Sequence, residues 1–488
     1  MKKIFSVILS VILVLGASGC AQRSGESAVH TAPQQSAPVL ERASSQSVYG
    51  EEQPAADEKI VLDEAIAESS EASESVSSQA QEETSSAPAS SSDTSLQAAS
   101  QPAQEPESQS AKTGTGTQET EVLAADPVYH EVRAVWLSYL TLEPMVKNKT
   151  KAQFTANIDQ AFANVAEAGF NTVFVHVRPF GDALYDSSYY PWSYLISGTE
   201  GKNPGYDPLK IMCELADSHG LRIEAWINPY RVRASGSRVL AADNQAKKWI
   251  ASGNDGALEW NGGVYYNPGS AEARKLIVNG VKEIVKNYNV DGIHFDDYFY
   301  PTTDMSFDKA TYQASGSSKS QADWRRENVN ILVREVYAAI KKIDNSCVFG
   351  ISPQGNMKNN YDAQFIDCAK WLSNKGYVDY ICPQIYFGFE NSGLPYAETV
   401  DAWNRMIKVS GIDLYIGIAA YKLGQADQWA GAGKNEWVGT TDILARMVKT
   451  ARNASHYGGA AIYSYDSLYL SNTAQVKTEK MNLKKLFR

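Results

Sequence analysis

Cysteine and histidine are scarce in this chain, with 5 Cys and 6 His among 488 residues. The sequence contains neither a Cys-x2-Cys spacing, typical of redox and metal motifs, nor a His-x3-His pair, typical of zinc ligands. We therefore expect no metal and no cofactor. Four cysteines fall within predicted strands or helices, where we expect buried, apolar thiols without disulfides: Cys213, Cys347, Cys368 and Cys382.

Long apolar runs are also absent, apart from one at residues 4–15, so we do not expect an integral membrane protein. This run follows Lys2-Lys3 and precedes the small residues 16–19, a pattern that predicts a signal peptide over 1–20. The Cys20 that follows resembles a bacterial lipobox cysteine, which implies a lipid anchor that holds the protein at the outer, extracytoplasmic face of the cell membrane. The alternative is an ordinary signal peptide with a chance cysteine.

An excess of basic charge is missing as well, since the formal net charge is −11. The four basic and nineteen acidic residues of 21–126 give that segment −15, and residues 1–20 carry +2, which leaves +2 for residues 127–488. A nearly neutral folded part argues against nucleic-acid binding, which needs a basic surface.

Aromatic residues are almost absent from residues 21–126, which hold 21 Ser and a single aromatic, Tyr49. A segment with so little apolar surface cannot offset the conformational entropy that folding removes. We expect a disordered Ser/Ala/Glu-rich linker that tethers the folded part.

Residues 127–488, in contrast, alternate short apolar runs with amphipathic stretches, and we expect them to fold together. The runs are nearly continuous in apolar character, as strands buried on both faces of a parallel sheet are. Eight such alternations predict an α/β fold, the (β/α)8 TIM barrel. The expected strands are 132–138, 172–177, 221–227, 292–297, 347–352, 380–386, 414–419 and 460–465.

Helices are expected between these strands, and two carry clear end signals. Gly169 is placed to end the first, whereas Asp207-Pro208 begins the second and Gly220 closes it. The others are expected at 271–288, 328–343, 365–374, 397–410 and 442–456.

In a TIM barrel the active site lies at the C-terminal ends of the strands. Carboxylates, amides, Arg, His and aromatic side chains collect at these ends here, a mixture that suits a sugar ligand. Side chains alternate along a strand, so Glu224 and Trp226 share a face with Asn228, and His294 shares one with Asp296. Charged groups under the helix layer would be unfavourable, so we place both sets in the barrel lumen.

Several stretches resemble one known family, the glycosyl hydrolase-like 10 family, over about residues 131 to 470. The resemblance implies a (β/α)8 barrel, glycoside hydrolysis, and, for extracytoplasmic members, an association with bacterial cell-wall glycan. It suggests peptidoglycan glycan strands as the substrate, which agrees with a tethered position outside the membrane. The matching stretches are 131–137, 168–172, 176–179, 224–231, 291–301 and 383–386.

Glycoside hydrolysis usually needs two carboxyl groups on either side of the scissile bond. Asp296 is the first choice for one of them, as nucleophile or general base. The general acid is left open between Asp297 and Glu390. Adjacent residues on one strand point apart, which argues against Asp296 and Asp297 as the two partners. Glu224 lies deep in its strand and is expected to be a structural acid paired with Arg178 or Arg231.

Eight further residues at the strand ends are candidates for substrate contacts, and each could instead serve barrel packing. For His294 the alternatives are tuning of Asp296 and a role as a satisfied core histidine, and for Asp466 they are substrate orientation and capping of the last loop. The candidates are Arg178, Trp226, Asn228, Arg231, His294, Gln384, Tyr386 and Asp466.

Two other functions compete with glycoside hydrolysis. One is a carbohydrate-binding lipoprotein without catalysis, which would lack a second carboxylate facing Asp296. The other is a metal-dependent polysaccharide deacetylase, suggested by the Asp296-Asp297 pair but lacking the expected histidine spacing. In either case we expect a monomer whose partners are a polysaccharide and, through the lipid, a membrane.

Overall fold

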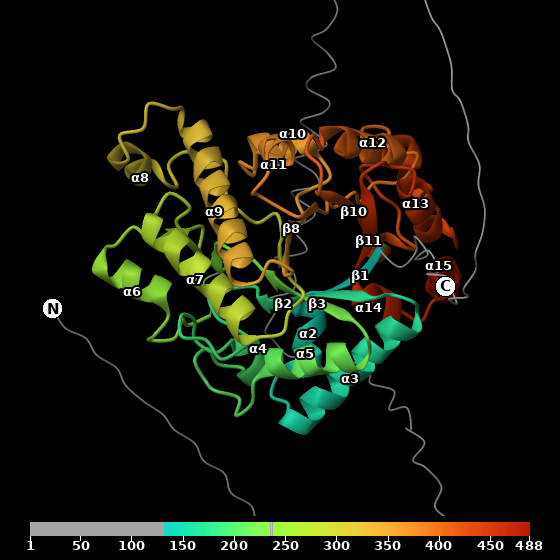
Figure 1. The fold of residues 1–488 in the computed structure, drawn as a ribbon, viewed down its shortest axis with the longest axis horizontal. Coiled ribbons are helices and arrows are strands. Elements are labelled where there is room, and N and C mark those ends of the chain that lie inside the picture. Colours follow the sequence, from blue (N-terminus) through green and yellow to red (C-terminus); the bar gives the residue numbers. More distant parts are fainter. Residues whose placement is uncertain (1–130, 235, 237) are drawn as a thin grey trace, which may run out of the picture. The chain divides into compact units, whose positions relative to one another are not determined.

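A computed structural model of the chain describes residues 131–234, 236 and 238–488 (Figure 1). The predicted signal peptide, the lipobox Cys20 and the predicted linker over 21–126 lie outside the described residues. Within the described part, no helix is long and apolar enough to cross a membrane.

Eight parallel strands close into a barrel, which confirms the predicted (β/α)8 fold. The order around the barrel is β1-β11-β10-β9-β8-β7-β3-β2. Each barrel strand after β1 therefore pairs with the barrel strand that precedes it in the sequence, and β4, β5 and β6 lie outside the barrel. The strands are β1 (Val132–Leu137), β2 (Thr172–Arg178), β3 (Arg222–Ile227), β7 (Gly292–Phe295), β8 (Val348–Ile351), β9 (Tyr380–Ile381), β10 (Asp413–Ala419) and β11 (Tyr457–Tyr463).

A helix follows each barrel strand and packs against its neighbours, as α7 and α9 do side by side (Figure 1). These outer helices are α3 (Lys151–Glu167), α5 (Pro208–Ser218), α7 (Ala271–Asn287), α9 (Gln321–Ile343), α11 (Cys368–Ser373), α12 (Tyr396–Met406), α13 (Ile443–Ala451) and α15 (Ala474–Phe487). Shorter helices occupy the loops: α2 (Tyr139–Val146), α4 (Tyr194–Ser197), α6 (Gln245–Ser252), α8 (Lys309–Ala314), α10 (Met357–Asp362), α14 (Tyr465–Tyr469), and the 3-10 turns η2 (Ala420–Lys422) and η3 (Gly431–Asn435).

The expected helix ends have the predicted chemistry. Asp207 caps α5 by accepting a hydrogen bond from the Lys210 backbone N–H, and Pro208 occupies the first helical position. Gly169, two residues after α3, has a φ of +89°, a conformation that side-chain-bearing residues rarely adopt.

Several features differ from the sequence prediction: α9 begins at Gln321 instead of residue 328, and β7 ends at Phe295 instead of residue 297. The sixth barrel strand was expected over 380–386, but β9 ends at Ile381, and Pro383 has no N–H with which to continue the ladder. The loop after β3 also contains an unpredicted antiparallel sheet of three strands: β4 (Arg231–Arg233), β5 (Ala257–Trp260) and β6 (Gly263–Tyr266).

Apolar side chains form two cores, one between barrel and helices and one inside the barrel. The inner core contains Trp136, Phe174, Tyr380 and Tyr415, which fill the lumen as expected for a packed barrel. All four described cysteines are buried and free, which confirms the prediction made for them.

Candidate active site

A buried chain of hydrogen bonds crosses the lumen. The indole Nε1 of Trp136 can only donate, so Nε2 of His294, 3.2 Å away, must be its acceptor. The proton of the neutral imidazole is then on Nδ1, which donates to the Tyr380 hydroxyl at 2.7 Å. The Tyr380 hydroxyl donates in turn to Oε2 of Glu224. The chain of donors therefore runs from Trp136 through His294 and Tyr380 to Glu224.

These hydrogen bonds decide between tuning of Asp296 and a core role for His294. They also correct the expected pairing of Glu224 with an arginine. Both ring nitrogens of His294 are bonded within the lumen, Nε2 also to the Ser352 hydroxyl at 2.9 Å, and burial lowers its pKa to about 3. His294 is thus a neutral, satisfied core histidine. Glu224 is hydrogen-bonded to Tyr380. Burial raises the pKa of Glu224 to about 7, and the positive charge of Arg222 opposes this shift.

Asp296 lies just beyond the end of β7 and turns toward β3. Its Oδ2 accepts from Nε1 of Trp226 at 3.1 Å and from Nδ2 of Asn228 at 3.5 Å. Its Oδ1 accepts from the backbone N–H of Tyr298 at 3.3 Å. The lumen-facing alternation of β3 and β7 therefore brings Trp226 and Asn228 to the carboxylate that the sequence singled out.

Asp297 turns toward the opposite neighbours, the segments that follow β8 and β9. Its Oδ1 accepts from Nε2 of Gln384 at 3.2 Å, and it is also hydrogen-bonded by Gln354. Both carboxyl groups are nearly inaccessible, with Asp296 2% and Asp297 8% exposed. Two adjacent acids thus share one end of the barrel while each is held by a different side of it.

Burial shifts both carboxyl groups toward their protonated forms. Burial, and then the charge of Asp297, raises the pKa of Asp296 to about 7, against the nearby positive charge of Arg231. Burial also raises the pKa of Asp297, although its hydrogen bonds and Arg231 oppose this. A carboxyl group with a pKa near neutral pH, as Asp296 has, suits proton transfer.

Arg231 is the cation of this site. It is buried and lies 4.8 Å from the ring of Phe180 and 4.8 Å from that of Tyr298. Its backbone N–H donates to Oδ1 of Asn228 at 3.1 Å, which orients the amide that contacts Asp296. It therefore lies where it stabilises negative charge on either acid.

His176 is a member of this site that the sequence reasoning did not assign. Its ring stacks on Trp226 with centroids 3.3 Å apart, and its Nε2 lies 3.9 Å from Oδ2 of Asp296. The signal was present, because His176 lies two residues before the end of β2, on the same face as the lumen residue Phe174.

Other predicted substrate contacts have different surroundings. Arg178 is only 1% exposed and donates to the carbonyls of Phe180 and Pro229, both at 3.1 Å, beneath the ring of Tyr190. It ties the β2 and β3 loops together, and its contact with substrate stays a prediction. Tyr386 lies in an aromatic cluster with Tyr421 and Tyr463, at centroid distances of 5.8 and 5.9 Å.

The two remaining acids lie apart from this arrangement. Asp466 accepts hydrogen bonds from the hydroxyls of Ser464 and Thr141, the latter at 2.8 Å, and so links α14 to α2. Glu390 is exposed in the loop after β9, and its backbone N–H donates to Oε2 of Glu436 at 3.0 Å. Of the two candidates for the general acid, Asp297 is the one buried with Asp296.

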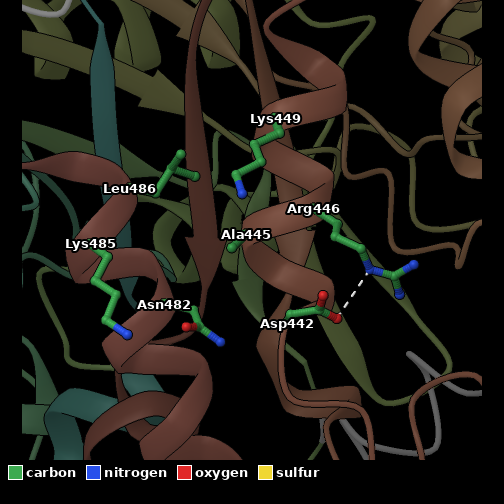
Figure 2. Close-up of a pocket in the computed structure, with 7 residues that line it drawn as sticks. All are labelled: Asp442, Ala445, Arg446, Lys449, Asn482, Lys485 and Leu486. Atoms are coloured by element: carbon green, nitrogen blue, oxygen red, sulfur yellow. Dashed lines mark ion pairs between the residues drawn. The ribbon is translucent and has the colours of Figure 1, made fainter.

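A surface cavity of about 450 Å³ lies elsewhere, between α13 and α15 (Figure 2). It is lined by basic side chains, of which Arg446 pairs with Asp442 at 3.1 Å. None of its lining residues belongs to the candidate site. Among the described residues, no three His, Cys, Asp or Glu side chains are grouped so that they could hold a metal ion.

A (β/α)8 barrel with paired buried carboxyl groups and aromatic rings at the C-terminal ends of its strands has the architecture of a glycoside hydrolase. The family model for glycosyl hydrolase-like 10 matches residues 131–433, and the chain belongs to this family. This confirms the resemblance seen in the sequence and assigns the chain to the glycoside hydrolases.

Curated relatives carry the same class name. The chain is 35% identical over 355 residues to glycosyl hydrolase YngK of Bacillus subtilis. The match covers 67% of this chain and 68% of that protein. It is 35% identical over 334 residues to glycosyl hydrolase DigH of Escherichia coli, covering 60% of this chain and 74% of that protein.

Among solved structures, the chain resembles the glycoside hydrolase domain of PgaB (BpsB) from Bordetella bronchiseptica. The TM-score is 0.49 at 13% sequence identity, and the match covers 72% of this chain and 98% of that one.

Proposed function

We propose that this protein hydrolyses the glycan strands of peptidoglycan from a lipid-anchored position on the outer face of the bacterial membrane. The observation that carries the chemistry is the pair of buried carboxyl groups, Asp296 and Asp297, beside the cation of Arg231. The family and the class names of its relatives support hydrolysis of a glycosidic bond. The signal-peptide pattern ending in Cys20 supports a location next to the cell wall.

We assign Asp296 as nucleophile or general base and Asp297 as general acid. Asp296 turns toward β3, where Trp226 and Asn228 hold its carboxylate oxygen. Asp297 is held from the opposite side by Gln384, and burial favours the protonated form that a general acid needs. The aromatic rings of Tyr386, Tyr421 and Tyr463 offer apolar faces to a sugar ring.

The test is to incubate the full chain with purified peptidoglycan and to follow new reducing ends together with the masses of the released fragments. Hydrolysis predicts shorter glycan strands with new reducing ends. The deacetylase alternative predicts released acetate and free amines at unchanged chain length, and a binding protein predicts retention on the glycan without any product. Either of these two outcomes would contradict the proposal.

A further inference from the structure

The tautomer of His176 is determined by a backbone contact. Its Nδ1 lies 3.1 Å from the backbone N–H of Tyr139, which can only donate. Burial, and then the charge of Arg231, lowers the pKa of His176 well below its usual value, so the ring is neutral at physiological pH. With Nδ1 as the acceptor, the single ring proton is on Nε2. His176 therefore presents a hydrogen-bond donor at Nε2.

This donor is held rigidly but is unpaired. The ring is stacked on Trp226 with an interplanar angle of 15° and makes a second aromatic contact with Tyr139 at 5.7 Å. His176 is 2% exposed, and its Nε2 has no hydrogen-bond partner among the described residues. A buried donor without a partner is unfavourable, because the water that it lost is not replaced. Such a donor is expected to be satisfied by a group that enters the site.

The geometry identifies the chemistry of that group. Nε2 of His176 and Oδ2 of Asp296 are 3.9 Å apart, too far for a direct hydrogen bond. An oxygen about 2.8 Å from each atom would see them at an angle of about 90°, and a hydroxyl can accept at one position while it donates at another. An ether oxygen cannot donate to the carboxylate, and an ammonium group cannot accept from the imidazole.

We propose that His176 and Asp296 together bind one hydroxyl oxygen, which accepts from Nε2–H of His176 and donates to Oδ2 of Asp296. The oxygen belongs either to a sugar hydroxyl next to the scissile bond or to the attacking water. In the second case the water gives its proton to Asp296 as its oxygen bonds to the sugar carbon, and the departing sugar oxygen takes a proton from Asp297. The proposal rests on the proposed glycoside hydrolysis.

Two variants of the full chain separate the donor from the ring. His176→Phe keeps a flat ring on Trp226 and removes the donor, whereas His176→Gln restores an amide N–H near the position of Nε2. We expect His176→Phe to lower kcat/KM on soluble peptidoglycan fragments by at least about tenfold, and His176→Gln to recover most of that loss. His219→Gln is the matched control, since His219 lies at the end of α5 and pairs with Asp159 at 2.7 Å.

Two substrate series distinguish the sources of the oxygen. If a sugar hydroxyl is bound, removing that hydroxyl from the fragment lowers the activity of the wild type. The same removal does not lower the activity of His176→Phe any further. If water is bound, His176→Phe lowers kcat on every fragment and changes the partition between water and added methanol as acceptor.

Three outcomes would overturn the proposal. Turnover of His176→Phe within about twofold of wild type shows that the donor is not used. Equal losses of turnover in His176→Phe and His176→Gln show that the His176 ring has only a structural role. Complete absence of wild-type turnover overturns the proposed function and this inference with it, so the two failures are distinguishable.

Discussion

The acids of the barrel lumen show how position decides the behaviour of a buried carboxyl group. Glu224 lies beneath the site, and among the described residues its hydrogen bond is to Tyr380 through Oε2. Asp296 at the strand end is surrounded by several donors and by Arg231. Both have pKa values raised to about 7 by burial. Glu224 lies below the proposed catalytic pair, so we expect its raised pKa to affect stability and not catalysis.

Substitution Glu224→Gln tests this expectation. Because the pKa of Glu224 rises from 4.5 to about 7 on folding, the folded state binds its proton more tightly. Its contribution to stability is present below about pH 4.5 and is lost as the pH rises to about 7. The neutral amide avoids that loss, so the variant should gain up to about 3 kcal/mol relative to wild type between pH 4.5 and 8. Denaturant unfolding of both proteins at pH 4.5 and 8 measures this gain, and an equal difference at both pH values would contradict it.

At the scale of elements, the sequence predicted the eight barrel strands because each one is a short apolar run ending in polar residues. It also predicted that Trp226, Asn228 and Asp296 share the lumen, since alternation along a strand is a local property. The β4–β6 sheet was not predictable in this way, because its strands are short and pair only within a long loop. The roles of Arg178 and His176 depend on contacts between separate strands, which no local pattern contains.

The packing of β8 against β9 gives a prediction for one glycine. A Cβ added at Gly350 would lie 2.0 Å from the ring of Tyr380, which leaves no space for it. Gly350→Ala should therefore destabilise the barrel by about 1–3 kcal/mol or more, as overpacked cores do. Gly393→Ala is the control, because the nearest atom to its Cβ is 3.8 Å away. Thermal unfolding of the two variants makes the comparison, and equal Tm values would contradict the account.

Relief by a second substitution provides an independent check. Tyr380→Leu removes the ring that Gly350 accommodates, so the double variant should be less destabilised than the sum of the two single changes. Strict additivity would show that the two residues do not compete for the same volume.

At the scale of the whole molecule, the lipid anchor that we propose at Cys20 would determine where the barrel works. We expect Cys20→Ser to move the protein from the membrane fraction to the medium, or to leave an uncleaved precursor, because it removes the thiol that we propose as the lipid attachment site. Fractionation of cells that express either form, followed by the mass of the N-terminal peptide, makes the measurement. Unchanged membrane association with normal processing would reject lipidation.

We propose above all that Asp296 and Asp297 perform hydrolysis at the C-terminal end of the barrel. The most direct measurement is the rate of reducing-end release from purified peptidoglycan by the full chain and by Asp296→Asn, Asp297→Asn and Glu390→Gln, with folding checked by circular dichroism. Each Asp variant should lose about 10²- to 10⁴-fold in turnover, whereas Glu390→Gln should stay close to wild type. A fully active Asp296→Asn, or a loss confined to Glu390→Gln, would contradict the account.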